Sequence, residues 1–125
     1  MKAVRIITAV RLIDMDIVEH VNKWWWGKTI NFVKNDGKAI VELQMDDNYP
    51  RVIFIKGLSV IELERRKGLG TELLALCERV ARKECAKFLQ LTADKEKEWL
   101  VEWYKKHGFV VFMHDEHEEV MVKAL

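Results

Sequence analysis

Three cations and two glycines occupy the point where a strand-like segment gives way to a helical pattern. The segment from Val52 to Ile61 is apolar and rich in β-forming residues, and residues 64–74 then read ERRKGLGTELL. A strand-to-helix turn points several unpaired backbone N–H groups the same way, and the helix dipole adds partial positive charge. Glycine lets the backbone approach a ligand closely and adopt a positive φ. The turn therefore favours binding of a phosphate or pyrophosphate.

The glycine spacing excludes two common phosphate-binding motifs. The Walker pattern is absent because Lys67 precedes Gly68 and no earlier glycine is in place. The Rossmann pattern also fails, because Leu73 stands where its third glycine belongs. Arg65, Gly68 and Gly70 instead fit the spacing R-x-x-G-x-G. A basic helix start with a glycine-containing turn would explain the same residues without a ligand.

Size and composition indicate a single globular domain over residues 1–125. Hydrophobic residues make up 50% of the chain, and the net charge of +1 gives no support for nucleic-acid or membrane binding. No apolar run approaches the ~18 residues of a membrane span. Arg5 and Arg11 interrupt the apolar N-terminal stretch, which argues against a signal peptide. Cys77 and Cys85 are expected on one helix, about 12 Å apart, as reduced thiols. We therefore expect a cytoplasmic protein.

Hydrophobic periodicity predicts seven strands and three helices. The first helix is expected to run from Asp14 or Asp16 to about Trp26, with Trp24 and Trp25 packed in the core. A second helix follows Gly68, and a third is capped by Asp94. The strands are expected at residues 3–12, 29–33, 38–45, 52–60, 88–92, 109–113 and 119–123. The order β-α-βββ-α-β-α-ββ indicates a mixed α/β sheet with helices packed on both faces.

Two motifs in the right order resemble the GNAT superfamily of N-acetyltransferases. The R-x-x-G-x-G spacing, after a strand and before a helix, is similar to the family's acetyl-CoA-binding motif. The sequence WYKKHGF at residues 103–109 looks like the Y-x-K-x-G-F that ends the family's penultimate helix. The resemblance covers roughly Lys28 to Leu125. The segment before it is shorter than usual for the family, which normally has two helices there.

The resemblance implies direct transfer of an acetyl group from acetyl-CoA to a primary amine held in a ternary complex. The pantetheine would lie where two neighbouring strands splay apart, and backbone groups around Leu58, Ser59 and Val60 would polarise the thioester carbonyl. Tyr104 matches the general acid that protonates the leaving thiolate, although a tyrosine packed in the helix stripe is the plainer interpretation. The pyrophosphate would be held by Arg65, Arg66, Lys67, Gly68, Leu69, Gly70 and Thr71.

This chain departs from the family pattern in two ways. The segment Val52–Val60 carries no carboxylate that could act as general base. Glu42 and Glu62 are candidates, but each is better interpreted as a surface glutamate. The family often has asparagine seven residues before the tyrosine, and this chain has Lys97 there.

Several functional alternatives stay open from the sequence. The acceptor could be a small molecule or a peptide. A GNAT-like domain that binds acyl-CoA without turnover, as a sensor or interaction module, is the second hypothesis. An unrelated phosphate-binding α/β domain, without a splay beside residues 58–60, is the third. Members of the family often form homodimers, and the sequence does not decide whether this chain does. The acidic turn at residues 114–119 matches no zinc motif, so we expect no metal; it could attract a cationic amine.

Overall fold

The computed structural model describes residues 5–14, 16–61, 65 and 68–125. No helix in these ranges is long and apolar enough to cross a membrane. The elements, in chain order, are β1 (Arg5–Asp14), β2 (Ile17–Trp24), β3 (Gly27–Lys34), the 3₁₀ turn η1 (Asn35–Gly37), β4 (Ala39–Asp46), β5 (Val52–Val60), α1 (Leu69–Lys83), β6 (Phe88–Asp94), α2 (Glu98–Lys106), β7 (Val110–His114) and β8 (Glu118–Ala124).

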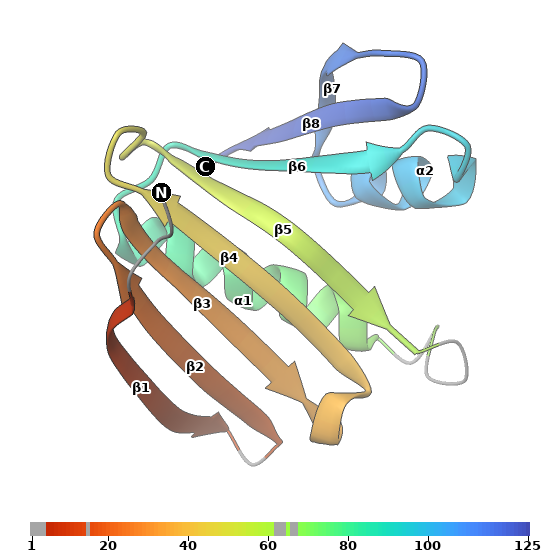
Figure 1. Ribbon diagram of the computed structural model, residues 1–125. Helices are drawn as coiled ribbons and strands as arrows, with labels where there is room; N and C mark the ends of the chain where they lie inside the picture. The colour runs from red at the N-terminus through yellow and green to blue at the C-terminus, as the bar shows by residue number, and fades with distance from the viewer. Residues whose placement is uncertain (1–4, 15, 62–64, 66–67) are drawn as a thin grey trace.

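One sheet contains all eight strands, in the order β1-β2-β3-β4-β5-β6-β8-β7 (Figure 1). The β5–β6 pair is parallel, and every other described neighbour pair is antiparallel. The parallel pair is joined through α1, because parallel strands need a crossover connection. The antiparallel neighbours are joined by short turns, except that the chain passes from β6 to β8 through α2 and β7. The last strand, β8, inserts between β6 and β7.

Both helices pack on the same face of the sheet. Ile55 of β5 and Leu91 of β6 are register partners, so both side chains point to one face, where both are buried. On the opposite face of β6, Phe88 and Thr92 are exposed. Because α1 contacts β4, β5 and β6, and α2 contacts β6, the core lies between this face and the two helices. Phe32, Leu43, Leu73, Leu89 and Met121 are completely buried there, each contributing about 1.5–3 kcal/mol.

The expected first helix is wrong, since residues 17–24 form the strand β2. Ile17 and Glu19 alternate toward the core with Val18 pointing away, and β2 pairs along its length with β1 and β3. Arg11 of β1 forms an ion pair with Glu19 at 3.1 Å, which makes an inward acidic side chain compatible with a strand. The predicted order is therefore wrong at this element, whereas the predicted mixed α/β sheet is confirmed. With that helix absent, the expectation of helices on both faces is wrong as well.

Trp24, Trp25 and Trp26 belong to the β2–β3 hairpin. Trp24 and Gly27 close it as register partners, and a side chain at Gly27 would lie 1.9 Å from the Met45 carbonyl oxygen. The rings of Trp24 and Trp26 stack with centroids 6.3 Å apart. Trp25 is 57% exposed, so the prediction that it packs in the core is wrong.

Two smaller predictions about the helices are also wrong. Asp94 does not cap α2, because the helix begins after Lys97. The Asp94 carboxylate instead accepts the Glu96 N–H at 3.0 Å and shapes the turn before the helix. Cys85 lies beyond the end of α1 with φ of 61°, so the two cysteines do not share a helix. Both cysteines are free, and Cys77 is buried.

A buried ammonium group joins the start of α1 to the N-terminal hairpin. Lys34 of β3 is 4% exposed, and its Nζ lies 2.8 Å from Asp16 Oδ2 and 2.7 Å from Glu72 Oε2. The hydrogen bond to Asp16, and then that to Glu72, raises the pKa of Lys34 above its usual 10.5. Because Glu72 belongs to the first turn of α1, this network fixes the position of that turn against the sheet.

The Lys34 network should stabilise the fold in a pH-dependent way. A raised pKa means that the folded chain holds the proton more tightly, so the stabilisation is complete below pH 10.5 and is lost as the pH rises through the raised pKa. Wild type and Lys34→Met should therefore converge in free energy of unfolding above pH 10.5, measured by urea denaturation. A difference that stays constant across that range would contradict this assignment.

Candidate active site

A bulge interrupts β5 halfway along its pairing with β4. Glu42 pairs with Gly57 and Leu43 pairs with Ile55, so Lys56 is an extra residue on β5. On its other side, β5 pairs with β6 only as far as Ile55 and Leu91. Beyond that point the two strands diverge, as Figure 1 shows. The splay expected beside residues 58–60 is therefore present.

The second half of β5 has backbone groups that face away from β4. The Ile61 N–H donates to the Lys38 carbonyl, which makes this a hydrogen-bonded pair. Such pairs alternate along an antiparallel ladder, so Ser59 also directs its N–H toward β4, whereas Leu58 and Val60 direct theirs toward the splay. Within the described residues, Leu58 and Val60 have no strand partner on that side. Of the three predicted residues, Leu58 and Val60 therefore direct backbone groups into the splay, and Ser59 does not.

The glycine-rich turn leads directly into the N-terminus of α1. Gly68 is the N-cap, with φ of 81°, and its carbonyl accepts the first helical hydrogen bond from the Glu72 N–H at 3.0 Å. The N–H groups of the first helical turn have no intrahelical acceptor, and they belong to Leu69, Gly70 and Thr71. They are three of the N–H groups at residues 66–71 that the sequence predicted to bind an anion. The predicted contributions of Arg66 and Lys67, and the position of Glu62, lie outside the described residues.

Arg65, just before the glycine-rich turn, contacts both the end of β5 and the helix α2. Its Nε donates to the Val60 carbonyl at 3.2 Å. Its guanidinium carbon lies 5.6 Å from the ring centroid of Trp99 on α2, within the range of a cation–π contact. A predicted phosphate-binding cation is therefore held, in this structure, between β5 and α2.

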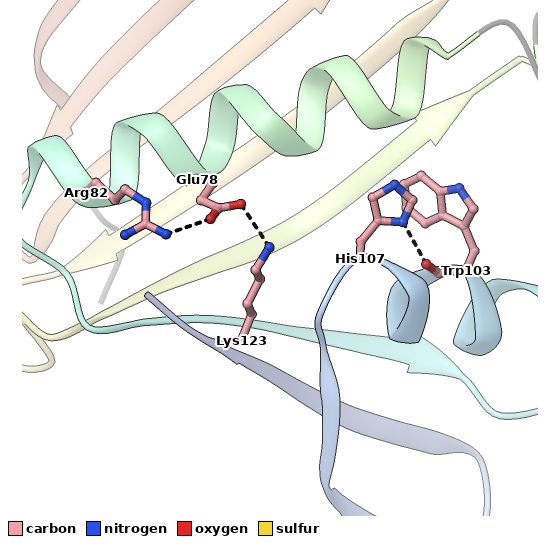
Figure 2. A network of polar contacts seen from close by, with 5 residues as sticks. All are labelled: Glu78, Arg82, Trp103, His107 and Lys123. Carbon is pink, nitrogen blue, oxygen red and sulfur yellow. Dashed lines mark hydrogen bonds and ion pairs between the residues drawn. The ribbon is translucent and has the colours of Figure 1, made fainter.

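The side chains of Trp103 and His107 reach from α2 toward the start of α1 (Figure 2). The Trp103 ring lies 3.3 Å from the position that a Gly70 side chain would take. His107 Nδ1 donates to the Trp103 carbonyl at 2.8 Å, because a carbonyl can only accept. In the neutral ring, Nε2 then accepts from the Thr71 hydroxyl at 3.2 Å. A side chain at Gly70 would therefore require the Trp103 ring to shift by a few tenths of an ångström.

Tyr104 lies in the core and contacts Trp103. It is 5% exposed, and its ring packs edge-on against Trp103 and Phe109. Burial, and secondarily the neighbouring Cys77, raises the pKa of Tyr104 to about 12. The phenol is therefore protonated at neutral pH, and no residue of the described chain forms a hydrogen bond with its hydroxyl. Tyr104 belongs to the same hydrophobic cluster as Leu58 and Val60.

An ion-pair network at Glu78 holds the middle of α1 against β8, on the β6 side of the splay. Lys123 of β8 donates to Glu78 Oε2 at 2.9 Å, and Arg82 donates to Glu78 Oε1 at 2.8 Å (Figure 2). The hydrogen bond from Lys123, followed by that from Arg82, lowers the pKa of Glu78. Since β8 pairs with β6, this contact ties the helix to the strand that diverges from β5.

Two cavities lie away from the glycine-rich turn. One, of about 480 Å³, is bordered by Lys28 and Glu84 at the far end of α1. The other, of about 350 Å³, lies between the end of β6 and the β7–β8 turn, lined by Asp94, Glu96, His117 and Glu118. Neither is lined by Tyr104 or by residues 58–60.

The remaining sequence candidates occupy exposed or half-buried positions. Glu42 is half-buried opposite the bulge, on the face without helices, and forms no ion pair within the described ranges. Lys97 is exposed at the start of α2. In the acidic turn, Asp115 Oδ1 accepts the N–H groups of His117 and Glu118, so this carboxylate shapes the turn. No group of three or more His, Cys, Asp or Glu among the described residues could hold a metal ion.

Sequence reasoning missed the contacts that α2 makes with the glycine-rich turn. Trp99, Trp103 and His107 are spaced four residues apart, and this spacing predicts that they share one apolar stripe of the helix. In the structure, Trp99 is 58% exposed against Arg65, and His107 meets Thr71. The spacing correctly indicates a common helix face, but it does not reveal which element that face meets.

Comparisons with known proteins agree on one family. A sequence profile described as the Acetyltransferase (GNAT) family matches residues 9–109. No curated protein sequence gives a significant match. Among solved structures, the PaiA N-acetyltransferase of Thermoplasma acidophilum, in complex with coenzyme A, has a TM-score of 0.67 at 19% identity. That match covers 78% of this chain and 60% of the other, so this chain spans less than two thirds of that protein.

Two further structures show the same fold. A GNAT family acetyltransferase from Elizabethkingia anophelis, with acetyl-CoA bound, has a TM-score of 0.66 at 17% identity, covering 80% of this chain and 77% of the other. Naa50 of Arabidopsis thaliana, in complex with a bisubstrate analogue, has a TM-score of 0.62 at 21% identity, covering 78% and 72%. At these identities the similarity establishes the fold.

Gly68 should be required for its backbone conformation rather than for space. No described atom lies within 4 Å of the position of an added side chain, but φ of 81° is left-handed. Gly68→Ala should therefore destabilise the chain by about 1 kcal/mol, and Gly68→Asn by less, because asparagine tolerates this region. Thermal unfolding of the two variants checks this order. Equal stability of Gly68→Ala and wild type would mean that the turn adopts another conformation in solution.

Proposed function

The chain belongs to the GNAT acetyltransferase family, and we propose that it transfers an acetyl group from acetyl-CoA to a primary amine by direct attack. The observation that carries the proposal is the separation of β5 from β6 after Ile55 and Leu91, beside the N-terminus of α1. It places unpaired backbone groups of one strand next to helical N–H donors. A thioester attached to a pyrophosphate needs both kinds of group.

The donor would be anchored through its pyrophosphate. The N–H groups of Leu69, Gly70 and Thr71 would donate to the phosphate oxygens, assisted by the partial positive charge of the helix terminus. Arg65 would add a full charge, and we propose the same role for Arg66 and Lys67. For this, the guanidinium of Arg65 must exchange its bond to the Val60 carbonyl for one to phosphate. The pantetheine would then take its place along β5.

The backbone of β5 would stabilise the charge that develops on the thioester oxygen. When the amine nitrogen attacks the carbonyl carbon, a C–N bond forms and the oxygen becomes negative before the C–S bond breaks. N–H groups of Leu58 and Val60 face the splay and can donate to that oxygen. Ser59 directs its N–H toward β4, so its proposed contribution is to hold this part of the strand in place. Holding amine and thioester together would supply about 7–11 kcal/mol of the barrier reduction.

Tyr104 would donate its proton to the departing thiolate. Its raised pKa keeps the phenol protonated at neutral pH, and the hydroxyl is not engaged by any side chain of the described residues. The amine loses its own proton to water, since β5 offers no carboxylate. The proposed acceptor is a primary amine of a small molecule or a peptide.

Tyr104→Phe should lower kcat by about tenfold or more, because a general acid typically contributes 10²–10⁴-fold. Affinity for acetyl-CoA should change little, since phenylalanine keeps the packing against Trp103 and Phe109. Steady-state kinetics with detection of the released thiol, together with calorimetric titration of acetyl-CoA, separates the two effects. Unchanged turnover would remove Tyr104 from the chemistry.

The absence of a carboxylate on β5 favours a second function, binding of acyl-CoA without turnover. Calorimetry with acetyl-CoA, CoA and ATP distinguishes the classes. Binding of both CoA species with thiol release in a panel of amines supports the transferase. Binding without release for any amine supports a sensor. Preference for ATP would contradict both and indicate a general phosphate-binding domain.

A further inference from the structure

Trp99 is an exposed indole in an unusual position. It is 58% exposed, although tryptophan is highly buried on average in folded proteins. It shares a helix face with Trp103, and one helical turn separates the two residues, a rise of about 5.4 Å. Trp103 in turn touches the first turn of α1 at Gly70. Trp99 therefore lies one turn of α2 away from Trp103, the residue that meets the anion-binding end of α1.

Arg65 is the described side chain that stacks on Trp99. Its guanidinium carbon is 5.6 Å from the ring centroid, while its Nε is bonded to the Val60 carbonyl. A planar cation on an aromatic ring is readily exchanged for another flat π system, because both are attracted to the face of the indole. Release of Arg65 toward a phosphate would uncover that face.

We propose that Trp99 is the stacking platform for the purine ring of the acyl donor, an inference that rests on the proposed function. In a nucleotide, a ribose separates the base from the phosphates, so a platform must lie about one sugar away from the phosphate-binding amides. Two contacts place Trp99 near those amides. Trp103, one turn of α2 from Trp99, meets Gly70, and Arg65, just before the glycine-rich turn, lies over the Trp99 ring. Arg65 covers the platform in the free protein and binds phosphate in the complex. Stacking on one ring adds affinity without selecting a particular base.

The platform predicts a loss of affinity confined to donors that carry the adenosine. Trp99→Leu should weaken CoA binding roughly 5- to 150-fold, the range for removal of one base–aromatic stack. Its affinity for 4′-phosphopantetheine, which lacks the adenosine, should be unchanged. Trp99→Phe should recover most of the CoA affinity. Calorimetric titration of the full chain measures each ligand, and thermal unfolding confirms that the variants fold.

Trp25→Leu is the matched control. Trp25 is 57% exposed, but it lies in the β2–β3 turn, which meets the opposite end of α1 through Lys28 and Glu84. This variant should bind CoA like the wild type. Adenosine 3′,5′-bisphosphate should quench tryptophan fluorescence in the wild type and in Trp25→Leu, but not in Trp99→Leu.

The outcomes separate the two proposals. If the wild type binds CoA and Trp99→Leu binds it equally well, the platform is wrong and the proposed function stands. The platform is equally wrong if Trp99→Leu weakens CoA and 4′-phosphopantetheine to the same extent, because the indole would then act on the pantetheine arm. If the wild type binds neither compound, the proposed function fails, and the platform fails with it.

Discussion

The parallel pairing of β5 with β6 ends after Ile55 and Leu91, and the arrangement of the rest of the site depends on this limit. Backbone N–H and C=O groups that lose a strand partner must find another, since leaving them buried and unpaired costs about 1–3 kcal/mol each. Leu58 and Val60 are in this position, and the Val60 carbonyl is satisfied by Arg65. The bulge at Lys56 marks the same place on the other side of β5. A strand that is bonded on one edge only is thereby made available for a ligand.

The two helices keep the diverging strands from closing. α1 packs on β4, β5 and β6, and Glu78 reaches across to Lys123 of β8. α2 covers β6 and is joined to the first turn of α1 by the bond between His107 and Thr71. The start of α1 is also attached to β3 through Glu72 and the buried Lys34. Two of these contacts fix the first turn of α1 and the third holds the middle of the helix, which suits a terminus that must present N–H donors in a constant geometry.

Sequence patterns predicted most of the fold and the turn, and their failures have identifiable causes. The run Val52–Val60 was predicted with its observed bounds, because apolar β-branched residues between Pro50 and a glycine-rich turn allow little else. Residues 17–24 were predicted as a helix because their apolar positions satisfy helical spacing as well as alternation. The choice was made by pairing with the neighbouring strands β1 and β3, whose ladder hydrogen bonds are not visible in the apolar spacing of residues 17–24 alone. Local propensity predicts secondary structure poorly for a segment that can form hydrogen-bonded ladders with a strand on each side.

The site could be predicted only to the level of backbone positions. R-x-x-G-x-G and the tyrosine motif located the turn and Tyr104, because both depend on local spacing. The N–H groups of Ser59 and its two neighbours point alternately toward β4 and toward the splay. This alternation follows from the pairing register, which a single sequence does not specify. The contact between Arg65 and Trp99 joins residues 34 positions apart across a turn and a helix, and no periodicity reports such a distance.

The sheet order makes the two ends of the structure mechanically unequal. β1 is an outermost strand, so detaching it disrupts a single ladder, that with β2. β8 lies between β6 and β7, so pulling it out would break two ladders and also remove Lys123, one of the two cations paired with Glu78. Under mechanical force, unfolding should therefore start at the N-terminal hairpin and reach the glycine-rich turn late. Force applied to β8 should instead disrupt the site early.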